Sequence, residues 1–191
     1  MNKTKLILAS GSPRRSELLT LCGYDFRIVA PDIEEIMDSS LSLPLAVENL
    51  AHQKADYIFK QFPDCIILGA DTIVTIDGIV LGKPKDSDDA YSMLKRLSGR
   101  THQVITGVSI IFPGAPEKKK NFHHCSSVSF YSLSDAQIRE YIFTNEPLDK
   151  AGSYGVQGKG ALFIEKIDGD FYSVMGLPIS MVHRALTTWH A

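Results

Sequence analysis

The sequence predicts an α/β fold with a mixed sheet, in which some neighbouring strands run parallel and others antiparallel. Apolar runs of strand length alternate with segments of helical periodicity, a pattern typical of parallel strands joined by helices. The dipeptide Asp77-Gly78 joins two of the apolar runs and is typical of a two-residue hairpin, which requires an antiparallel pair. The 191 residues suffice for a sizeable core and contain no linker or repeat, so we expect a single domain over residues 1–191.

The first half of the chain begins with a strand, a helix and a second strand. Leu6-Ile7-Leu8 is apolar, and Ser12-Pro13 is typical of a helix start, with a capping residue followed by proline at the first helical position. A long amphipathic helix and the hairpin follow. The expected ranges are strands at 5–9, 26–30, 65–76 and 79–81, and helices at 13–22 and 44–61.

The second half opens with a helix that Asp86 or Ser87 caps and Gly99 closes. Two long strands follow, and we expect the lysines at 118–120 to lie in the solvated loop between them. The expected ranges are helices ending near 97, over 134–143 and from 178 onward, and strands at 101–112, 122–132 and, after the glycine-rich stretch 152–160, at 161–167.

Composition places the chain among ordinary globular proteins, with 44% hydrophobic residues, 22% charged residues and a formal net charge of −2. No global positive field recruits nucleic acid, so an anionic ligand needs a local group of cations. The three cysteines lack a CxxC spacing, which predicts reduced, mostly buried thiols. No apolar run has the length of a signal peptide or membrane span. We therefore expect a cytoplasmic protein with no nucleic-acid and no membrane partner.

The stretch LASGSPRRSELL, residues 8–19, places two arginines in the first turn of a predicted helix. Arg14 and Arg15 would lie beside unpaired backbone N–H groups at the positive end of the helix dipole, which is unfavourable for a cation. A bound anion would reverse this effect, and a strand, a small-residue turn from Ser10 and a helix N-terminus are the parts of a phosphate site. An ordinary turn with solvated arginines explains the segment equally well.

Two charged residues interrupt apolar patterns. Lys54 lies in the middle of an apolar helical stripe, and Asp71 interrupts an apolar strand. A buried charge is costly unless it is paired. Lys54 must therefore reach out to solvent, pair with a carboxylate or meet a bound anion, and for Asp71 a structural salt bridge competes with a functional role. The stripe around Lys54 consists of Val47, Leu50, Ala51 and Ile58.

A group of charged residues would suit a polyphosphate and its divalent cation if the fold brought them together. Cations would neutralise phosphate oxygens, and carboxylates would hold Mg²⁺ or activate water. Because the six residues are scattered along the chain, their convergence is a hypothesis. They are Arg14, Arg15, Lys54 and Lys83 with the carboxylates of Asp71 and Glu35.

Two further motifs are weaker. The stretch GVQGKG, residues 155–160, is rich in glycine, but it lacks the GxxxxGK[ST] arrangement and precedes a predicted strand, so it does not predict a Walker-type phosphate loop. His123 and His124 are adjacent in a predicted strand and would point to opposite faces, which makes them a poor joint metal site.

Six motifs, in order along nearly the whole chain, resemble the Maf family of nucleoside triphosphate pyrophosphatases. The resemblance implies an elongated α/β body with a central mixed sheet flanked by helices and a deep cleft between two lobes, as in Maf and ITPase-like proteins, and often a homodimer. It also implies hydrolysis of a small-molecule nucleoside triphosphate to the monophosphate and pyrophosphate, with a divalent cation such as Mg²⁺ or Mn²⁺. The motifs are LASGSPRR (8–15), LGADTIV (68–74), LGKP (81–84), LSGRTHQVITGV (97–108), EPLDKAGSYGVQG (146–158) and GLP (176–178).

Within the family, Thr72 after Asp71 and the stretch AGSYGVQG are most similar to the branch that acts on dTTP and UTP. The resemblance implies a house-cleaning role that could extend to modified pyrimidine nucleotides such as 5-methyl-UTP or pseudo-UTP. A glutamine amide can donate to and accept from the edge of a pyrimidine, which suits Gln157 as a specificity residue.

The resemblance implies a role for each matching residue. Asp71 would accept a proton, with Lys54 and Lys83 beside it as catalytic cations. Glu35 and Asp71 would hold the metal. The substrate-binding and specificity residues would be Ser10, Arg14, Arg15, Thr72 and Gln157.

One departure from the family pattern leaves an alternative open. Where the family commonly has Glu-x-Lys-Ala, this chain has His52-Gln53-Lys54-Ala55, so a carboxylate is missing and the affinity for metal is expected to be weaker. The chain could then be a nucleotide-binding regulator of cell division or septum formation with little turnover. A phosphatase or nucleotidyl transferase that uses the same cluster is the third hypothesis.

Overall fold

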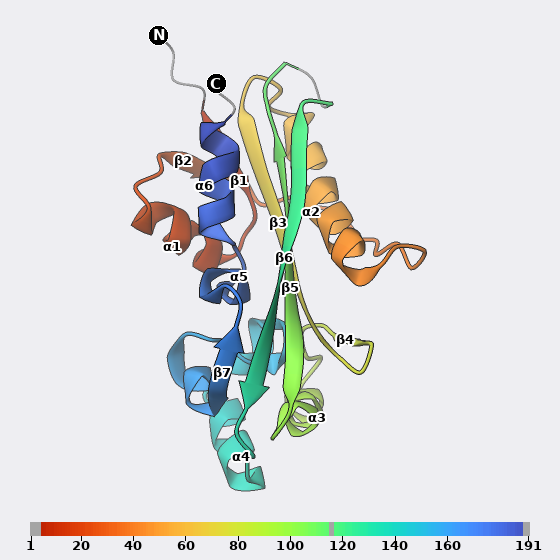
Figure 1. The fold of residues 1–191 in the computed structure, drawn as a ribbon, viewed down its shortest axis with the longest axis vertical. Coiled ribbons are helices and arrows are strands. Elements are labelled where there is room, and N and C mark those ends of the chain that lie inside the picture. The colour runs from red at the N-terminus through yellow and green to blue at the C-terminus, as the bar shows by residue number, and fades with distance from the viewer. Residues whose placement is uncertain (1–4, 115–116, 189–191) are drawn as a thin grey trace. The chain divides into compact units, whose positions relative to one another are not determined.

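Among residues 5–114 and 117–188, which this computed structural model describes, seven strands form one mixed sheet (Figure 1). The strand order is β2-β1-β3-β5-β6-β7, and β4 pairs with β3. β1 pairs in parallel with β2 and β3, whereas the pairs β3–β4 and β6–β7 are antiparallel, which confirms the predicted α/β class with a mixed sheet. The strands are β1 (Leu6–Ala9), β2 (Phe26–Ile28), β3 (Ile66–Ile76), β4 (Ile79–Leu81), β5 (Thr101–Ile111), β6 (Lys119–Phe130) and β7 (Ile164–Asp168).

The helices begin and end close to the residues that their capping signals predict. The Asp86 carboxylate accepts a hydrogen bond from the Asp89 amide at the start of α3, and Ser134 forms a capping box with Gln137 at the start of α4. The helices are α1 (Pro13–Leu21), α2 (Leu43–Phe59), α3 (Ser87–Leu97), α4 (Asp135–Phe143), α5 (Phe171–Met175) and α6 (Ile179–Thr187), with short 3₁₀ turns η1 (Glu146–Asp149), η2 (Ala151–Ser153) and η3 (Gly158–Phe163).

The hairpin between β3 and β4 forms as predicted. Asp77 has φ of 54° and Gly78 has φ of 74°, and two successive positive φ values are what a type I′ turn requires. The register pairs Val74 with Leu81 and Ile76 with Ile79.

The chain divides into two compact units, and β3, β5 and β6 contribute residues to both. Unit 1 consists of Met1–Asp71, Thr106–His124 and Gly176–Ala191, and unit 2 consists of Thr72–Ile105 and Cys125–Met175. Each unit has an apolar cluster of its own. The cluster of unit 1 is aliphatic apart from Phe59, and its buried members are Ile7, Ala9, Ala55, Ile58, Phe59, Ile67 and Ile111.

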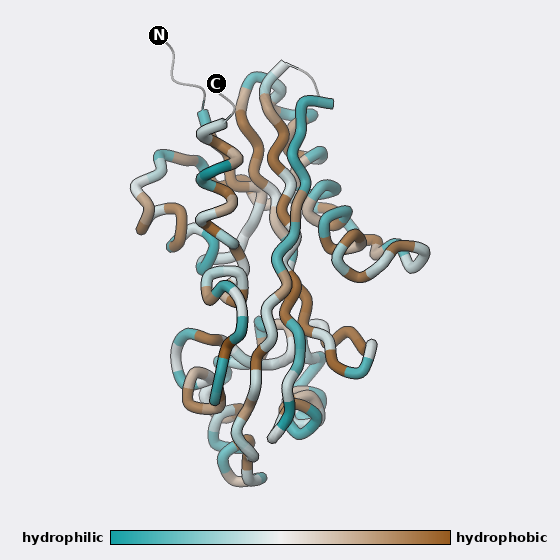
Figure 2. Tube along the Cα trace, in the orientation of Figure 1, coloured by the Kyte–Doolittle hydropathy of each residue, from teal (hydrophilic) through white to brown (hydrophobic). Residues whose placement is uncertain are grey.

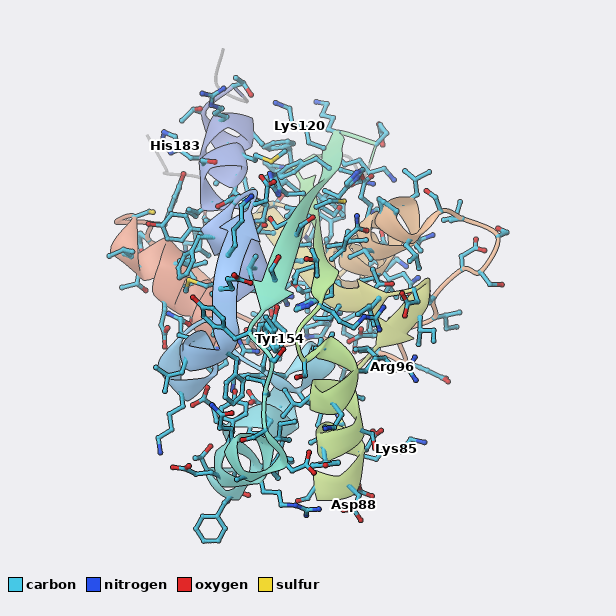
Figure 3. The ribbon with its side chains drawn as sticks, turned by 60° about the horizontal axis from the view of Figure 1, so that its bottom comes forward. Lys85, Asp88, Arg96, Lys120, Tyr154 and His183 are labelled. Carbon is cyan, nitrogen blue, oxygen red and sulfur yellow. The ribbon has the colours of Figure 1, made fainter. Side chains whose placement is uncertain are left out.

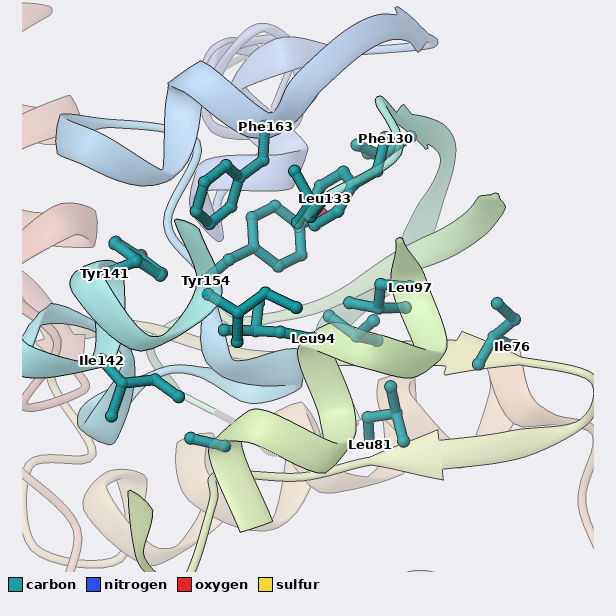
Figure 4. Close-up of a cluster of buried hydrophobic side chains, with 14 of the residues drawn as sticks. Ile76, Leu81, Leu94, Leu97, Phe130, Leu133, Tyr141, Ile142, Tyr154 and Phe163 are labelled. Carbon is teal, nitrogen blue, oxygen red and sulfur yellow. The ribbon is translucent and has the colours of Figure 1, made fainter. Parts of the chain in front are cut away.

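The apolar cluster of unit 2 is larger and contains four aromatic side chains (Figure 4). Edge-to-face contacts join Tyr154 to Phe130, Phe130 to Phe163 and Phe163 to Tyr141, and the ring centroids of Phe130 and Tyr154 are 4.7 Å apart. Leu94 and Leu97 of α3 cover this group. Hydrophobic residues also dominate β3 in Figure 2, which agrees with the burial of nearly all its side chains.

Several sequence-based expectations are wrong in detail. β6 begins at Lys119 instead of near residue 122, because the Phe112 amide bonds to the Lys118 carbonyl at 2.9 Å and extends the pairing toward the loop. Lys120, labelled in Figure 3, donates to the Thr188 hydroxyl instead of lying in a solvated loop. Residues 115–116 of the expected loop lie outside the described residues.

Other corrections concern the C-terminal half and the cysteines. Residues 161–163 belong to the 3₁₀ turn η3 instead of a strand, and α5 was not predicted. Cys22 and Cys125 are exposed and Cys65 is half-buried, so the expectation of mostly buried thiols is wrong. In the part of the chain that the structure describes, no helix is both long and apolar enough to cross a membrane.

Candidate active site

Two glycines determine how closely α2 packs on the strands of unit 1. A Cβ atom at Gly69 of β3 would lie 2.3 Å from the Ala51 carbonyl oxygen, and one at Gly107 of β5 would lie 2.5 Å from the Val47 backbone. Real side chains do not tolerate such distances, so only glycine permits this approach. Lys54 follows Ala51 by one helical turn and Asp71 follows Gly69 by two strand residues, so the close packing brings these two charged residues together.

Lys54 is buried and bridges two carboxylates. Its exposed fraction is 8%, and its ammonium lies 2.5 Å from Asp71 Oδ1 and 2.9 Å from Glu35 Oε1. Asp71 is 9% exposed, whereas Glu35 is exposed. The alternative in which Lys54 extends into solvent is therefore wrong. A buried ion pair offsets its desolvation only with good geometry, so this arrangement is weak evidence for stability and directs attention to function.

Arg15 lies in the first turn of α1, directly after the parallel strand β1. Its side chain is buried, and it donates from Nη1 to Ser10 Oγ and from Nε to the Gly176 carbonyl, both at 2.9 Å. The Ser12 amide also donates to Ser10 Oγ, at 3.2 Å. Arg15 is thus a fixed guanidinium instead of a solvated one, while Arg14 beside it is half-buried. The predicted arrangement of strand, serine turn and helix with two leading arginines is confirmed.

Arg15 belongs to the same electrostatic cluster as the Lys54 ion pairs. Burial lowers the pKa of the Arg15 guanidinium, the charges of Asp71 and Glu35 raise it, and the charge of Arg14 lowers it. We call Arg14, Arg15, Glu35, Lys54 and Asp71 the charged cluster. Its three cations exceed its two carboxylates, so it has a net positive charge that favours an anionic ligand.

The parallel pairing of β1 with the first half of β3 explains why distant residues meet in this cluster. β1 and β3 are parallel, and Ala9 at the end of β1 lies opposite Gly69 of β3. Ser10 and Asp71 follow these two residues along the chain, so both lie beyond the carboxyl end of β1. Ligands of open α/β sheets typically bind at this end of the strands. The hypothesis that Lys54, Asp71, Glu35 and Arg15 converge is confirmed within unit 1.

Three of the predicted site residues belong to unit 2, and their convergence with the charged cluster stays a prediction. Thr72 directly follows Asp71 in β3 and is half-buried. Lys83 follows β4 and Gln157 precedes η3, and both side chains are exposed.

His52 occupies the position at which the family pattern has a glutamate. Its Nδ1 lies 3.3 Å from Ser109 Oγ and its Nε2 lies 3.0 Å from Lys119 Nζ, so the ring contacts β5 and β6. Burial lowers the pKa of His52, and the charge of Lys119 lowers it further. The neutral imidazole therefore serves as a hydrogen-bonding partner in the packing of α2.

Gly69, Gly107 and Gly176 help to build the site, although they were not predicted to take part in it. Gly69 and Gly107 interrupt apolar strands, and an isolated glycine in a strand indicates a close backbone approach. That signal could have located the contact of α2. The carbonyl of Gly176 had no signal, because any residue carries one.

The donor set fits a divalent cation that also uses oxygens of the substrate. Asp71 and Glu35 contact one ammonium and are thus close neighbours, and Mg²⁺ is usually held by one or two carboxylates together with substrate phosphates. No group of three or more His, Cys, Asp or Glu side chains suitable for a metal occurs among residues 5–114 and 117–188.

A family model described as Maf-like protein matches residues 5–189. The chain belongs to the Maf family. A protein of Bacillus pumilus named dTTP/UTP pyrophosphatase is 51% identical over 185 residues, covering 97% of this chain and 96% of the relative. A protein of the same name from Bacillus velezensis is 52% identical over 182 residues, covering 95% of each chain. The solved structure of the Staphylococcus aureus Ham1 protein has a TM-score of 0.47 and 16% identity, over 66% of this chain and 72% of that one.

Proposed function

We propose that this Maf protein hydrolyses dTTP and UTP to the nucleoside monophosphate and pyrophosphate. The observation that carries the proposal is the charged cluster, in which Lys54 holds the carboxylate of Asp71 beside the arginines of α1. Two relatives named dTTP/UTP pyrophosphatase, about half of whose residues are identical over nearly the full length, support the choice of substrate.

Asp71 is the proposed proton acceptor. Water attacks the α-phosphorus and transfers a proton to the Asp71 carboxylate. The bond between the α-phosphorus and the oxygen that bridges to the β-phosphate breaks. Pyrophosphate is the leaving group. Lys54 would orient Asp71 and, with Arg15 and Lys83, stabilise the negative charge that builds up on the phosphate oxygens.

We propose that Glu35 and Asp71 hold a divalent cation, Mg²⁺ or Mn²⁺, together with the phosphates. The cation would neutralise charge and orient the phosphates when bound. Lys54 contacts both carboxylates and thereby holds the two proposed metal ligands close to each other.

Substrate recognition is assigned to two sets of residues. Ser10, Arg14 and Arg15, at the N-terminus of α1, would bind the phosphates, and Arg14 would also take part in selectivity. Thr72 and Gln157 would read the pyrimidine edge, for which the glutamine amide has both a donor and an acceptor. The proposed partner is therefore a small molecule, a standard or modified pyrimidine nucleotide, and the proposed location is the cytoplasm. A homodimer is also proposed, and light scattering would distinguish it from a monomer.

The substitution Asp71→Asn tests the proposal. The two side chains have nearly the same shape, and Lys54 retains Glu35 as a partner, so the fold should persist. Loss of the proton acceptor should lower kcat for UTP by at least about 100-fold. The measurement is release of pyrophosphate from UTP and dTTP with Mg²⁺ or Mn²⁺, with circular dichroism to verify folding.

Asp56→Asn is the matched control, since Asp56 also belongs to unit 1 but forms a surface ion pair with Lys60 at 2.8 Å. Its activity should stay within about twofold of wild type, as expected for a surface pair. Full activity of the Asp71→Asn protein would overturn the assigned role. Tight UTP binding without product would favour the regulator hypothesis, and orthophosphate or a nucleotidylated acceptor as product would favour a phosphatase or transferase.

A further inference from the structure

The glycine-rich stretch at residues 155–160, which matches no Walker motif, encloses a carboxylate of the protein itself. Glu146 Oε2 accepts a hydrogen bond from the Lys159 amide at 3.1 Å, and Oε1 accepts one from the Gly160 amide at 3.3 Å. Successive backbone N–H groups of this kind form an anion-binding nest. In this protein the nest holds Glu146, which lies at the start of the EPLDKAGSYGVQG motif.

The glycines of this stretch are required by the contact. Gly158 has φ of +77°, which L residues rarely adopt, and a Cβ atom there would lie 2.9 Å from Glu146 Oε2. A Cβ atom at Gly160 would lie 2.4 Å from the Gly155 carbonyl oxygen. Alanine at position 158 would therefore strain the backbone and crowd the carboxylate, and alanine at position 160 would force the loop backbone apart at Gly155.

A second set of contacts holds the other side of the loop. The Tyr141 hydroxyl donates to Glu146 Oε1 at 2.9 Å and accepts from the Gly155 amide at 3.2 Å. Lys150 Nζ donates to the Glu146 carbonyl at 2.6 Å. Glu146 is thereby connected to backbone amides on both sides of Gln157.

The hydroxyls that anchor the loop are themselves held by the core of unit 2. Tyr141 packs edge to face on Phe163, with ring centroids 5.0 Å apart, and both rings lie in the apolar cluster of Figure 4. Tyr154, which precedes Gly155, is buried there as well, and its hydroxyl lies 2.7 Å from His102 Nε2. The loop backbone is thus fixed although the Gln157 side chain is exposed.

We propose that Glu146 is a positioning residue that sets pyrimidine selectivity through Gln157, by fixing the backbone at Gly155, Lys159 and Gly160. The inference rests on the proposed function, in which Gln157 reads the base. A specificity residue on a free loop would adapt to several base edges, whereas a fixed one rejects the edge whose donors and acceptors do not match.

Steady-state kinetics with UTP and CTP tests the inference. UTP and CTP differ at the base edge that Gln157 would read, so wild type should prefer UTP. Glu146→Gln keeps the size of the side chain but replaces one acceptor oxygen with a donor, and it should reduce the UTP-to-CTP ratio of kcat/KM about tenfold, since small misplacements have large effects. Gln157→Ala should reduce the ratio similarly, and the double variant should lose no more than either single variant.

Tyr141→Phe is the second variant, because it removes only the hydroxyl that connects Glu146 to Gly155, and it should shift the ratio in the same direction. Glu165→Gln, at an exposed residue of β7, is the matched control and should leave the ratio unchanged. Hydrogen exchange at the amides of residues 155–160 should become faster in Glu146→Gln and stay unchanged in the control.

The possible outcomes separate the two proposals. If wild type releases no pyrophosphate from UTP, the proposed function fails and the inference fails with it. If wild type is active and both Glu146→Gln and Tyr141→Phe lower kcat/KM for UTP and CTP by one factor, Glu146 is merely structural and the inference alone is overturned. Additive losses in the double variant, or a wild type without preference, overturn it as well.

Discussion

Both units bury hydroxyls, but among the described residues they differ in whether they also bury charged side chains. Among the described residues, the buried side chains with a formal charge are Arg15, Lys54 and Asp71, all in unit 1. The buried polar groups of unit 2 are hydroxyls and the imidazole of His102.

Unit 1 contains buried charges whose desolvation costs free energy, whereas unit 2 is stabilised by the packing of its aromatic cluster. Buried ion pairs can often be replaced by apolar residues without loss of stability, so stability alone does not account for the buried charges of unit 1. In unit 2 the His102 imidazole and the Tyr154 hydroxyl lie 2.7 Å apart beside the aromatic cluster, and a neutral pair of this kind fixes local geometry at lower electrostatic cost.

The largest effect is expected from Lys54→Met, which leaves the Asp71 and Glu35 carboxylates without their shared ammonium. Unpaired buried charge should lower the free energy of unfolding by about 3 kcal/mol and abolish pyrophosphate release. Urea unfolding followed by circular dichroism measures the change.

Two comparisons sharpen this prediction. In the Asp71→Asn background the same substitution should cost less, because the more buried carboxylate is already neutral. Lys60→Met removes a surface ion pair at the exposed end of α2 and should cost at most about 0.5 kcal/mol. Equal losses at Lys54 and Lys60 would contradict the distinction between buried and surface charge in unit 1.

A smaller, pH-dependent effect is expected from unit 2. Burial lowers the pKa of His102 to about 4. In the unfolded chain a histidine takes up its proton near pH 6.5, so between pH 6.5 and 4 the unfolded state binds more protons and stability falls as the pH falls. Wild type should lose about 2 kcal/mol more than His102→Gln between pH 7.5 and pH 5.

Urea unfolding of both proteins at several pH values measures this difference. Other titrating groups, His52 included, are present in both proteins and cancel in the comparison. Parallel curves of stability against pH would show that His102 takes up its proton without unfolding.

The smallest effect is expected from Tyr154→Phe, which removes the hydroxyl 2.7 Å from His102 Nε2 but keeps the ring contacts with Phe130. A buried nitrogen without a partner should cost about 1 kcal/mol. Tyr131→Phe, at an exposed tyrosine, should change stability very little. A loss at Tyr154 as large as that at Lys54 would mean that the two units do not differ as described.

Much of the fold and the core of the site could be predicted from local patterns. The hairpin at Asp77-Gly78, the caps at Asp86 and Ser134 and the start of α1 depend on backbone preferences that act over a few residues. The misfit of Lys54 in an apolar stripe could be recognised because amphipathic periodicity is also local, although the sequence left open whether Lys54 reaches solvent, a carboxylate or an anion. The predicted start of β6 was wrong because pairing with β5 overrode local preference. The predicted strand at residues 161–163 was wrong because the turn η3 forms where the backbone binds Glu146.

By itself, the sequence determined which residues are chemically able to bind the substrate or take part in catalysis, and where the helices begin and end. The tertiary structure alone decided which carboxylates Lys54 binds, because that depends on the close approach of α2 to Gly69 and on a loop carrying Glu35. It also decided that the glycines around Gln157 hold Glu146 instead of a phosphate. Contacts between residues distant in sequence follow from packing, which local preferences do not encode.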